Sequence, residues 1–368
     1  MTEENKENRV IQELRGTPIY CRSISPDQIK IVEKYIDAHT ISGGHNLKKT
    51  KLSGKLTISG SSSIYLVMAN LIKQEKQNNV NIIISDELYC DTPKIIKSFG
   101  CNTTEINVNK PDSILTLFQT IKNGGFGDKD STNILFFESA SNPNGNIFPF
   151  DIIPKLRLLS KKLYVVVDNT WLTHIIFNPF KYDVDIVVNS CSKYYSAGQC
   201  ISGMIISKHT QFMNSLESFS KIMGYHVSVD YCKLLLENFD SLSDRLVKSH
   251  KNTIELTKVL KSYSLNIRNS SNPDDPSHQL ALKYYNNVSV DDNQIIHPSV
   301  INVFLNKPIG LVKQLLFDNN IITQTSFGAS HTKVCNFIHS VTPTSTQIRI
   351  SVGYGPIDLE MFSFLKEN

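Results

Sequence analysis

The strongest constraint on the fold is a regular alternation of short apolar runs with helical patterns, which extends from about residue 55 to about residue 207. Short runs rich in Val, Ile and Phe predict buried strands, and the stretches between them have the periodicity of helices. Strands that alternate with helices form βαβ units, so the pattern predicts a mostly parallel sheet covered by helices on both faces. The strand-like runs are "VNIIIS", "NILFFES", "LYVVVDN", "DIVVNS" and "GMIIS".

The domain organisation follows from length and from a change of pattern. A chain of 368 residues exceeds the usual single-domain size. We expect an N-terminal arm and helix over residues 1–55 and a large domain over 56–225. One long helical pattern over 228–263 then bridges to a small mixed domain, so that linker helix and small domain together occupy 226–368. Strands are predicted at "HPSVINVFL" and "TQIRISVG", and a closing helix at "DLEMFSFLKEN".

Composition excludes several classes of protein. The formal net charge of +4 is modest and no long basic block exists, which disfavours nucleic-acid binding. The seven cysteines are scattered without a C-x-x-C pair, which disfavours a disulfide framework or a zinc site and favours a reducing compartment. The N-terminus is polar and no apolar run reaches bilayer length. We therefore expect a soluble cytoplasmic protein with no membrane or nucleic-acid partner and no metal.

Chemically useful side chains follow two of the predicted strands. One strand ends at Asp168, and the next is followed by Ser190, Ser192 and Lys193. Open α/β sheets bind ligands at the carboxyl ends of their strands, so an acid, two hydroxyls and an amine could share one crevice. Alternatively, Asp168 caps a turn and Lys193 extends its ammonium to solvent. These residues alone leave both interpretations open.

A third element is a run of small residues, Ser59 to Ser63, at the expected start of a helix. Exposed N–H groups and the positive end of the helix dipole suit a phosphate there. An ordinary serine N-cap is the alternative. The stretch "SGKLT" is no Walker loop, because it lacks the upstream glycine spacing and a hydroxyl residue directly after the lysine. A lysine, a carboxylate and a phosphate cradle are together the parts that a pyridoxal 5'-phosphate enzyme requires.

The stretch "VVVDNTWLTHIIFNPFKYDVDIVVNSCSKYYSAGQCISG" resembles the signature of the Cys/Met-metabolism pyridoxal phosphate enzymes. That family includes cystathionine γ-lyase, cystathionine γ-synthase, cystathionine β-lyase and methionine γ-lyase. The resemblance implies that Lys193 forms the Schiff base with the cofactor and that Asp168 pairs with its pyridine nitrogen. It also implies phosphate contacts from Ser190 and Ser192, with Gly60 and Ser61 at the helix start completing the cofactor site.

Other matches to this family occur in the same order along the chain. "YCRSISP" implies that Tyr20 and Arg22 reach across a dimer interface to the neighbour's cofactor phosphate. "SDELYCDT" implies that Tyr89 stacks on the cofactor and assists proton transfer. "FFESASNPNG" implies that Asn142 hydrogen-bonds the cofactor's phenolic oxygen.

Two further matches concern the substrate. "IRISVG" implies that Arg349 clamps the substrate α-carboxylate, and "TSFGAS" places Ser326 beside it. With these segments the resemblance covers residues 20 to about 357.

The chain departs from the family pattern at three positions near the expected site. Ser61 replaces an apolar residue after Gly60 and could add a phosphate ligand. Asp91 stands where methionine γ-lyases carry a reactive cysteine and other members a glycine, so an acid alters the pocket. Thr325 stands where cystathionine γ-lyases typically carry a glutamate, which leaves recognition of cystathionine open.

The resemblance implies a type I, aspartate aminotransferase-like α/β fold with a mostly parallel seven-stranded sheet and a small C-terminal α/β domain. It implies a homodimer at least, and a homotetramer built from two dimers, with cofactor sites shared across an interface. The activity we expect is that of a carbon–sulfur lyase of trans-sulfuration, acting on a sulfur amino acid by α,γ- or α,β-elimination in cysteine biosynthesis or methionine metabolism. The alternatives are γ-replacement on an O-acylated homoserine and a catalytically degenerate paralogue that binds the cofactor.

Overall fold

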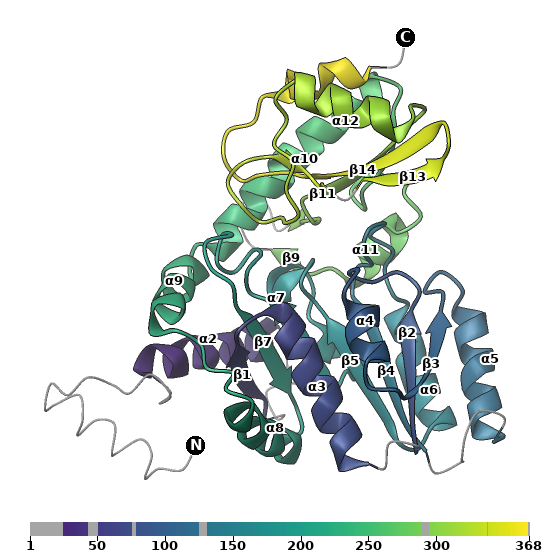
Figure 1. Ribbon diagram of the computed structural model, residues 1–368, viewed down its shortest axis with the longest axis vertical. Coiled ribbons are helices and arrows are strands. Elements are labelled where there is room, and N and C mark those ends of the chain that lie inside the picture. The colour runs from purple at the N-terminus through teal and green to yellow at the C-terminus, as the bar shows by residue number, and fades with distance from the viewer. Residues whose placement is uncertain are drawn as a thin grey trace, which may run out of the picture.

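A computed structural model describes residues 25–42, 51–75, 79–124, 131–288, 294–336 and 338–366 (Figure 1). Its larger unit is built on a seven-stranded sheet of order β1-β7-β6-β5-β4-β2-β3. The run from β3 through β2, β4 and β5 to β6 is parallel, while β7 and β1 pair antiparallel at one edge. The predicted mostly parallel seven-stranded sheet is confirmed. The strands are β1 (Ser53–Thr57), β2 (Val80–Ser85), β3 (Asn102–Ile106), β4 (Thr132–Glu138), β5 (Leu163–Asp168), β6 (Ile186–Ser190) and β7 (Gly203–Ser207).

Helices cover both faces of this sheet, which explains why its central strands are buried at nearly every position and mostly apolar. In β2, Ile82 and Ile84 pack in one core with α3, α4 and α8, whereas Ile83 belongs to the core on the other face with α2, α5 and α6. Side chains alternate between the faces of a strand, so both sets of positions are buried. The helices are α2 (Pro26–Ser42), α3 (Gly60–Gln74), α4 (Thr92–Lys97), α5 (Pro111–Lys122), α6 (Ile153–Leu159) and α8 (Thr210–Ile222).

Short elements complete the larger unit beside the sheet. They are the helical turns η2 (Phe150–Ile152), α7 (Thr173–Ile176) and η3 (Pro179–Tyr182), helix α11 (His278–Tyr284), and the two-stranded pair β9 (Asn287–Val288) and β10 (Gln294–Ile295).

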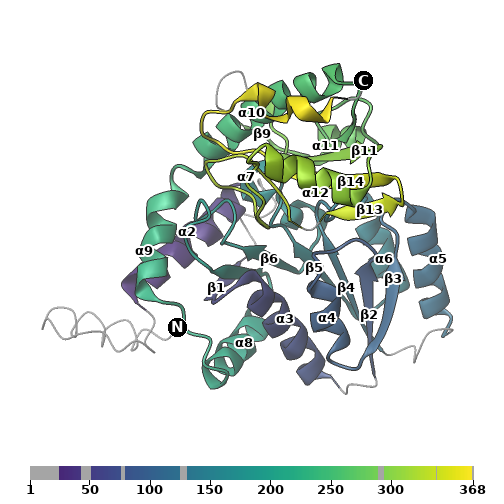
Figure 2. The ribbon, with the colours of Figure 1, turned by 45° about the horizontal axis from the view of Figure 1, so that its top comes forward.

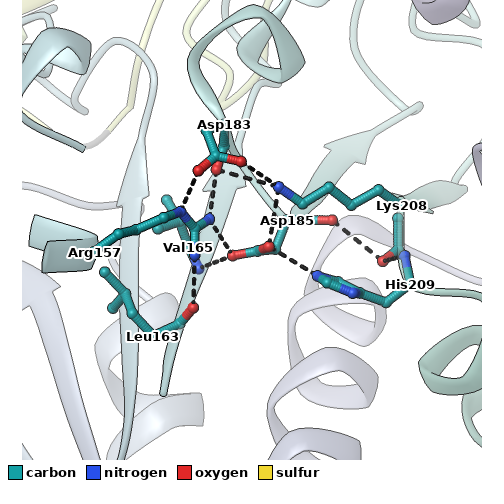
Figure 3. A network of polar contacts seen from close by, with 8 residues as sticks. Arg157, Leu163, Val165, Asp183, Asp185, Lys208 and His209 are labelled. Atoms are coloured by element: carbon teal, nitrogen blue, oxygen red, sulfur yellow. Dashed lines mark hydrogen bonds and ion pairs between the residues drawn. The ribbon is translucent and has the colours of Figure 1, made fainter. Parts of the chain in front are cut away.

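A buried carboxylate, Asp185, secures the amino-terminal ends of β5 and β6 (Figure 3). Its oxygens accept from Arg157 (2.7 Å), from His209 (2.8 Å) and from the backbone N–H of Val165 (2.8 Å), and Lys208 lies at 3.3 Å. Burial raises the pKa of Asp185, but the bonds from His209 and the charges of Lys208 and Arg157 outweigh it and bring the pKa to about 2. This network lies at the end of the strands opposite to the residues predicted to bind the cofactor.

The predicted single helix over 228–263 is wrong in one respect, because it is two helices. Helix α9 (Val229–Phe239) ends before Asp240 and Ser241, and α10 (Leu242–Ser262) begins after them. Helix α9 packs beside α2, and α10 runs from the larger unit up into the smaller one (Figures 1 and 2). The break lets one continuous apolar pattern pack against two different partners.

The smaller unit contains a five-stranded antiparallel sheet. One face of this sheet carries Ile301, Val303, Ile348 and Ile350, which pack into a separate apolar core with α10 and the C-terminal segment. The closing segment is a 3₁₀ helix, η4 (Leu359–Leu365). The remaining elements are β8 (Asn266–Arg268), β11 (Val300–Leu305), α12 (Ile309–Asp318), β12 (Lys333–Val334), β13 (His339–Thr342) and β14 (Ser345–Ser351).

In the described ranges, none of the helices has the length and apolar character needed to cross a bilayer. The domain limits at residues 55 and 225 stay a prediction, as does the cytoplasmic location.

Candidate active site

A cavity of about 260 Å³ lies at the carboxyl ends of β4, β5 and β6. It brings together most of the residues that the sequence predicted for a cofactor site. The predicted residues that line it are Gly60, Ser61, Tyr89, Asn142, Asp168, Ser190, Ser192 and Lys193. The two strand ends that the sequence singled out, those of β5 and β6, therefore meet the start of α3 at one cavity.

The amino terminus of α3 forms one wall of the cavity. Ser59 caps this helix: its hydroxyl accepts from the N–H of Ser62 (3.0 Å) and its carbonyl from the N–H of Ser63 (3.0 Å). The N–H groups of Gly60 and Ser61 have no acceptor in the described part of the chain, because the first turn of a helix offers none. The serine cap and the anion site are thus compatible, and two N–H groups remain for a ligand.

Glycine at position 60 is required by the close approach of β6. A Cβ atom at Gly60 would lie 2.7 Å from the Cβ of Ser190 and 3.0 Å from its Cα. The hydroxyl of Ser190 has no recorded partner within the described residues, whereas that of Ser192 donates to the carbonyl of Ser202 (3.1 Å). Ser190 and Ser61 are therefore freer than Ser192 to donate to a phosphate.

The half-buried amine of Lys193 lies near two cations. Burial, the charge of Arg349 and the charge of Lys333 lower the pKa of Lys193 to about 8, against partial compensation from Cys335 and Asp168. Its Nζ lies 5.6 Å from the ring centroid of Phe327, another residue of the cavity wall. About a tenth of Lys193 is therefore an uncharged, nucleophilic amine at pH 7, far more than at an ordinary lysine.

The loop that carries Lys193 is held from two sides. The guanidinium of Arg245, on α10, donates to the carbonyl of Tyr194 (2.6 Å) and to that of Asn238 (2.7 Å). From the other side Gly328 approaches so closely that a Cβ there would lie 2.7 Å from the backbone nitrogen of Tyr194. The linker helix and the smaller unit thus both fix the backbone next to the lysine.

Asp168 faces a second carboxyl group that the sequence analysis did not single out. Its carboxylate accepts from the N–H (2.9 Å) and the hydroxyl (2.5 Å) of Thr170. Glu138 is its register partner on β4 and accepts from the N–H of Tyr89 (2.6 Å). Burial raises the pKa of Asp168, and burial together with the charge of Asp168 raises the pKa of Glu138 further. A cationic ligand atom between them would be favoured.

Tyr89 is held at the cavity by that bond from its backbone to Glu138, and its side chain is 38% exposed. Burial of the rest, together with the adjacent Asp91 carboxylate, raises the pKa of Tyr89 to about 12. Asp91 itself is half-buried, does not line the cavity, and pairs with Lys94 at 2.9 Å. Tyr89 therefore carries its proton at neutral pH, and the departure at position 91 strengthens that tendency.

Of the four predicted substrate-binding residues, Asp91 lies beside α4 in the larger unit, and the other three lie on the smaller unit. Arg349 on β14 is 8% exposed and donates to the side-chain oxygen of Asn142 at 2.6 Å, which joins the smaller unit to the cavity. Ser326 is half-buried and Thr325 is exposed, and neither lines the cavity. Tyr20 and Arg22 lie outside the described residues, so their predicted role across a dimer interface stays a prediction.

The sequence analysis missed four lining residues with evident chemistry or shape: Glu138, Thr170, Trp171 and Phe327. Glu138 could have been predicted from the sequence, because it is the last residue of a strand, as Asp168 is, and the two strands are neighbours. Phe327 comes from the other unit, and no local pattern indicates that contact.

Solved structures share this architecture. The crystal structure of cystathionine γ-lyase from Lactobacillus plantarum, complexed with L-serine, aligns with a TM-score of 0.74 at 18% identity, covering 95% of this chain and 89% of that one. This likeness shows the type I fold of pyridoxal phosphate enzymes.

The family model for "Cys/Met metabolism PLP-dependent enzyme" matches residues 7–353. The chain belongs to that family, and pyridoxal 5'-phosphate is its cofactor. Cystathionine beta-lyase of Schizosaccharomyces pombe is 28% identical over 194 residues, which are 52% of this chain and 48% of that protein. Mimosinase of Mimosa pudica is 24% identical over 231 residues, which are 61% of this chain and 50% of that protein. The matched stretches span about half the length of these relatives.

Proposed function

We propose that this protein is a carbon–sulfur lyase of the trans-sulfuration type, which eliminates a thiol from the side chain of a sulfur amino acid. The observation that carries the proposal is that Lys193, Asp168 and Tyr89 line one cavity with the start of α3, where two N–H groups have no acceptor among the described residues. Arg349, bonded to Asn142, adds a guanidinium for the α-carboxylate of an amino acid.

The residues of the cavity fit pyridoxal phosphate. The start of α3 and the end of β6 approach so closely that a Cβ atom at Gly60 would meet Ser190. Together they offer backbone N–H groups and hydroxyls to a phosphate. Asp168 offers a half-buried carboxylate to a protonated ring nitrogen, and Lys193 offers the amine to which the cofactor joins. The cofactor, when bound, supplies the electron sink that makes the substrate's Cα proton acidic.

In this proposal Lys193 moves the protons. Its low pKa makes the free amine available to accept the Cα proton at Nζ and to return a proton elsewhere on the substrate. The fixed backbone of its loop, bonded through Tyr194 to Arg245, limits the positions that Nζ can reach. The same amine can therefore serve successive proton transfers on one face of the substrate.

Tyr89 has the properties of an acid for the leaving group. Its high pKa keeps the phenol protonated at neutral pH, and it can donate to a departing sulfur. That hydrogen bond stabilises the negative charge of a thiolate that leaves from Cβ or Cγ. Arg349 meanwhile keeps the α-carboxylate at the other end of the substrate, so that the scissile bond is oriented.

The second candidate reaction is γ-replacement on an O-acylated homoserine. It uses the same lysine, carboxylate, tyrosine and arginine, so those residues do not distinguish it. What favours it is the absence, in the described residues that line the cavity, of any acid other than Glu138 and Asp168 to meet a distal substrate amine. The acyl group of an O-acylated homoserine leaves as a carboxylate and carries no amine, so it needs no such acid.

The test is a product assay with the holoenzyme. The protein is incubated in turn with cystathionine, cysteine and methionine, and with O-acetylhomoserine in the presence of cysteine. Release of a 2-oxo acid and a thiol supports the lyase, and formation of a thioether supports γ-replacement. Lys193→Ala abolishes either product, whereas the exposed Lys155→Ala retains wild-type activity.

Absence of every product from a protein that retains the cofactor would contradict both reactions. The chain would then be the catalytically degenerate paralogue that binds the cofactor.

A further inference from the structure

The sheet of the smaller unit turns one polar face toward the active site. Side chains alternate along β14, so Gln347, Arg349 and Ser351 share the face opposite to the apolar core. Arg349 bonds Asn142, and Gln347 bonds Asn144, and both asparagines follow β4 in the larger unit. This face therefore meets the loop that forms part of the cavity.

Lys333 belongs to the same face. It is the register partner of Ser351 on β14, and cross-strand partners in an antiparallel pair project to the same side. Its neighbour Val334 projects into the apolar core on the other side. Lys333 and Arg349 thus stand on one surface, two strand positions apart across the β12–β14 pair.

The ammonium of Lys333 is buried without a counter-ion. The residue is 3% exposed, and its Nζ donates to the side-chain oxygen of Gln324 at 2.9 Å. Within the described ranges it forms no ion pair, unlike Lys55, which is similarly buried and pairs with Glu217. Lysine is rarely buried without a partner charge, because removing the ammonium from water is costly.

The charge of Lys333 reaches the reacting amine. Together with Arg349 it lowers the pKa of Lys193, which places both cations within electrostatic range of that nitrogen. Gln347 and Ser351 on this face are neutral, and Arg268, which shares the face through Asn302, already pairs with Asp275 at 3.5 Å. A substrate α-carboxylate that pairs with Arg349 would neutralise that cation, and the positive charge of Lys333 would still have no counter-ion among the described residues.

We propose that Lys333, with Gln324, forms a subsite for a second anionic group at the far end of the substrate side chain, a carboxylate or a phosphate. This proposal rests on the proposed function, because it assumes an α-amino acid bound at Arg349. The amide of Gln324 can turn to donate to the anion while the ammonium of Lys333 pairs with it. The subsite selects substrates whose leaving group carries negative charge.

The test measures binding of unreactive amino acids to the holoenzyme by calorimetry. L-norleucine has no distal charge, L-2-aminoadipate has a distal carboxylate, and L-2-amino-5-phosphonopentanoate has a distal phosphonate. The wild type is expected to bind one of the two anionic ligands at least about tenfold more tightly than L-norleucine. Which of them binds more tightly identifies the anion.

Variants then show whether Lys333 causes the preference for anionic ligands over L-norleucine. Lys333→Met keeps the aliphatic stem and is expected to remove the preference while leaving the affinity for L-norleucine within about twofold. Lys333→Arg retains it, because the charge remains. Lys313→Met, at an exposed lysine of α12 in the same unit, changes neither affinity.

The outcomes separate the two proposals. Binding of L-norleucine with no preference for either anion, or a preference that survives in Lys333→Met, would overturn the subsite and leave the amino-acid site intact. If none of the three ligands binds, the proposed function and the subsite both fail.

Discussion

Glu138 and Asp168 stand opposite each other on the parallel strands β4 and β5, where the buried Glu138 and the half-buried Asp168 line one cavity. Two carboxyls so placed cannot both ionise without cost. The pair is suited to a ligand that brings a positive charge, which is what a protonated pyridine nitrogen provides. Before the ligand binds, the pair holds a proton that the unfolded chain would release.

This pair predicts how the cofactor-free protein responds to pH. The folded pKa values of both groups lie above their ordinary values of 3.8 and 4.5, so the folded state binds more protons than the unfolded state above that range. The contribution of this pair to the free energy of unfolding should therefore fall as pH rises from about 5 to 8. Glu138→Gln, which keeps the acceptor for the N–H of Tyr89, should reduce that slope.

Urea unfolding of both proteins at pH 5 and pH 8 measures the effect. An identical pH dependence in wild type and Glu138→Gln would show that this carboxyl is not the source.

The amine of Lys193 should titrate near pH 8 in the cofactor-free protein, well below the ordinary lysine value of 10.5. Arg349→Met should raise the pKa of Lys193, because Arg349 lowers that pKa more than the other nearby cation, Lys333, does. Trace acetylation at a series of pH values, followed by mass spectrometry of the peptide that contains Lys193, gives the titration midpoint. A midpoint that does not move in Arg349→Met would contradict the charge effect.

Gly60→Ala should weaken binding of the cofactor by at least about tenfold, because the added Cβ meets Ser190 at 2.7 Å. The matched control is Gly310→Ala, where a Cβ meets nothing within 4 Å. Titration of each cofactor-free protein with pyridoxal phosphate measures the affinity. Equal affinities for the two variants would show that the space beside Ser190 is not the phosphate cradle.

Asp185→Asn should lower the free energy of unfolding by about 3 kcal/mol, because it breaks a buried ion-pair network (Figure 3). The folded pKa of about 2 lies below the ordinary value of 3.8, so this contribution is present above pH 4 and is lost as pH falls toward 2. The exposed Glu237→Gln is the control for loss of one surface carboxylate. Thermal unfolding at pH 7 and pH 3 should show a difference between Asp185→Asn and wild type that shrinks at the lower pH.

Much of the fold followed from local patterns, because the central strands are buried on both faces and so consist almost entirely of apolar residues. The segment "LYVVVD" predicts a strand and its carboxylate end at once. The break between α9 and α10 did not follow, because the helical pattern continues across Asp240 and Ser241. Only the packing of each half against a different neighbour reveals it.

The site residues that follow strand ends could be predicted from the sequence. The contacts between the larger and the smaller unit could not. Asp168, Ser190 and Lys193 follow from the rule that parallel strands present their carboxyl ends together. The contact of Arg349 with Asn142 joins residues far apart in the sequence, and the roles of both rested on resemblance alone. Lys333 has no sequence signal, since its lack of a counter-ion depends on which residues the fold places around it.

The measurement that tests the central claim most directly is the covalent attachment of the cofactor. The holoenzyme is reduced with borohydride and digested, and the peptides are mapped by mass spectrometry. We predict the cofactor's mass on the peptide that contains Lys193 and its loss in Lys193→Ala. Attachment to another lysine, such as Lys333, or no attachment in the wild type would contradict the site described above.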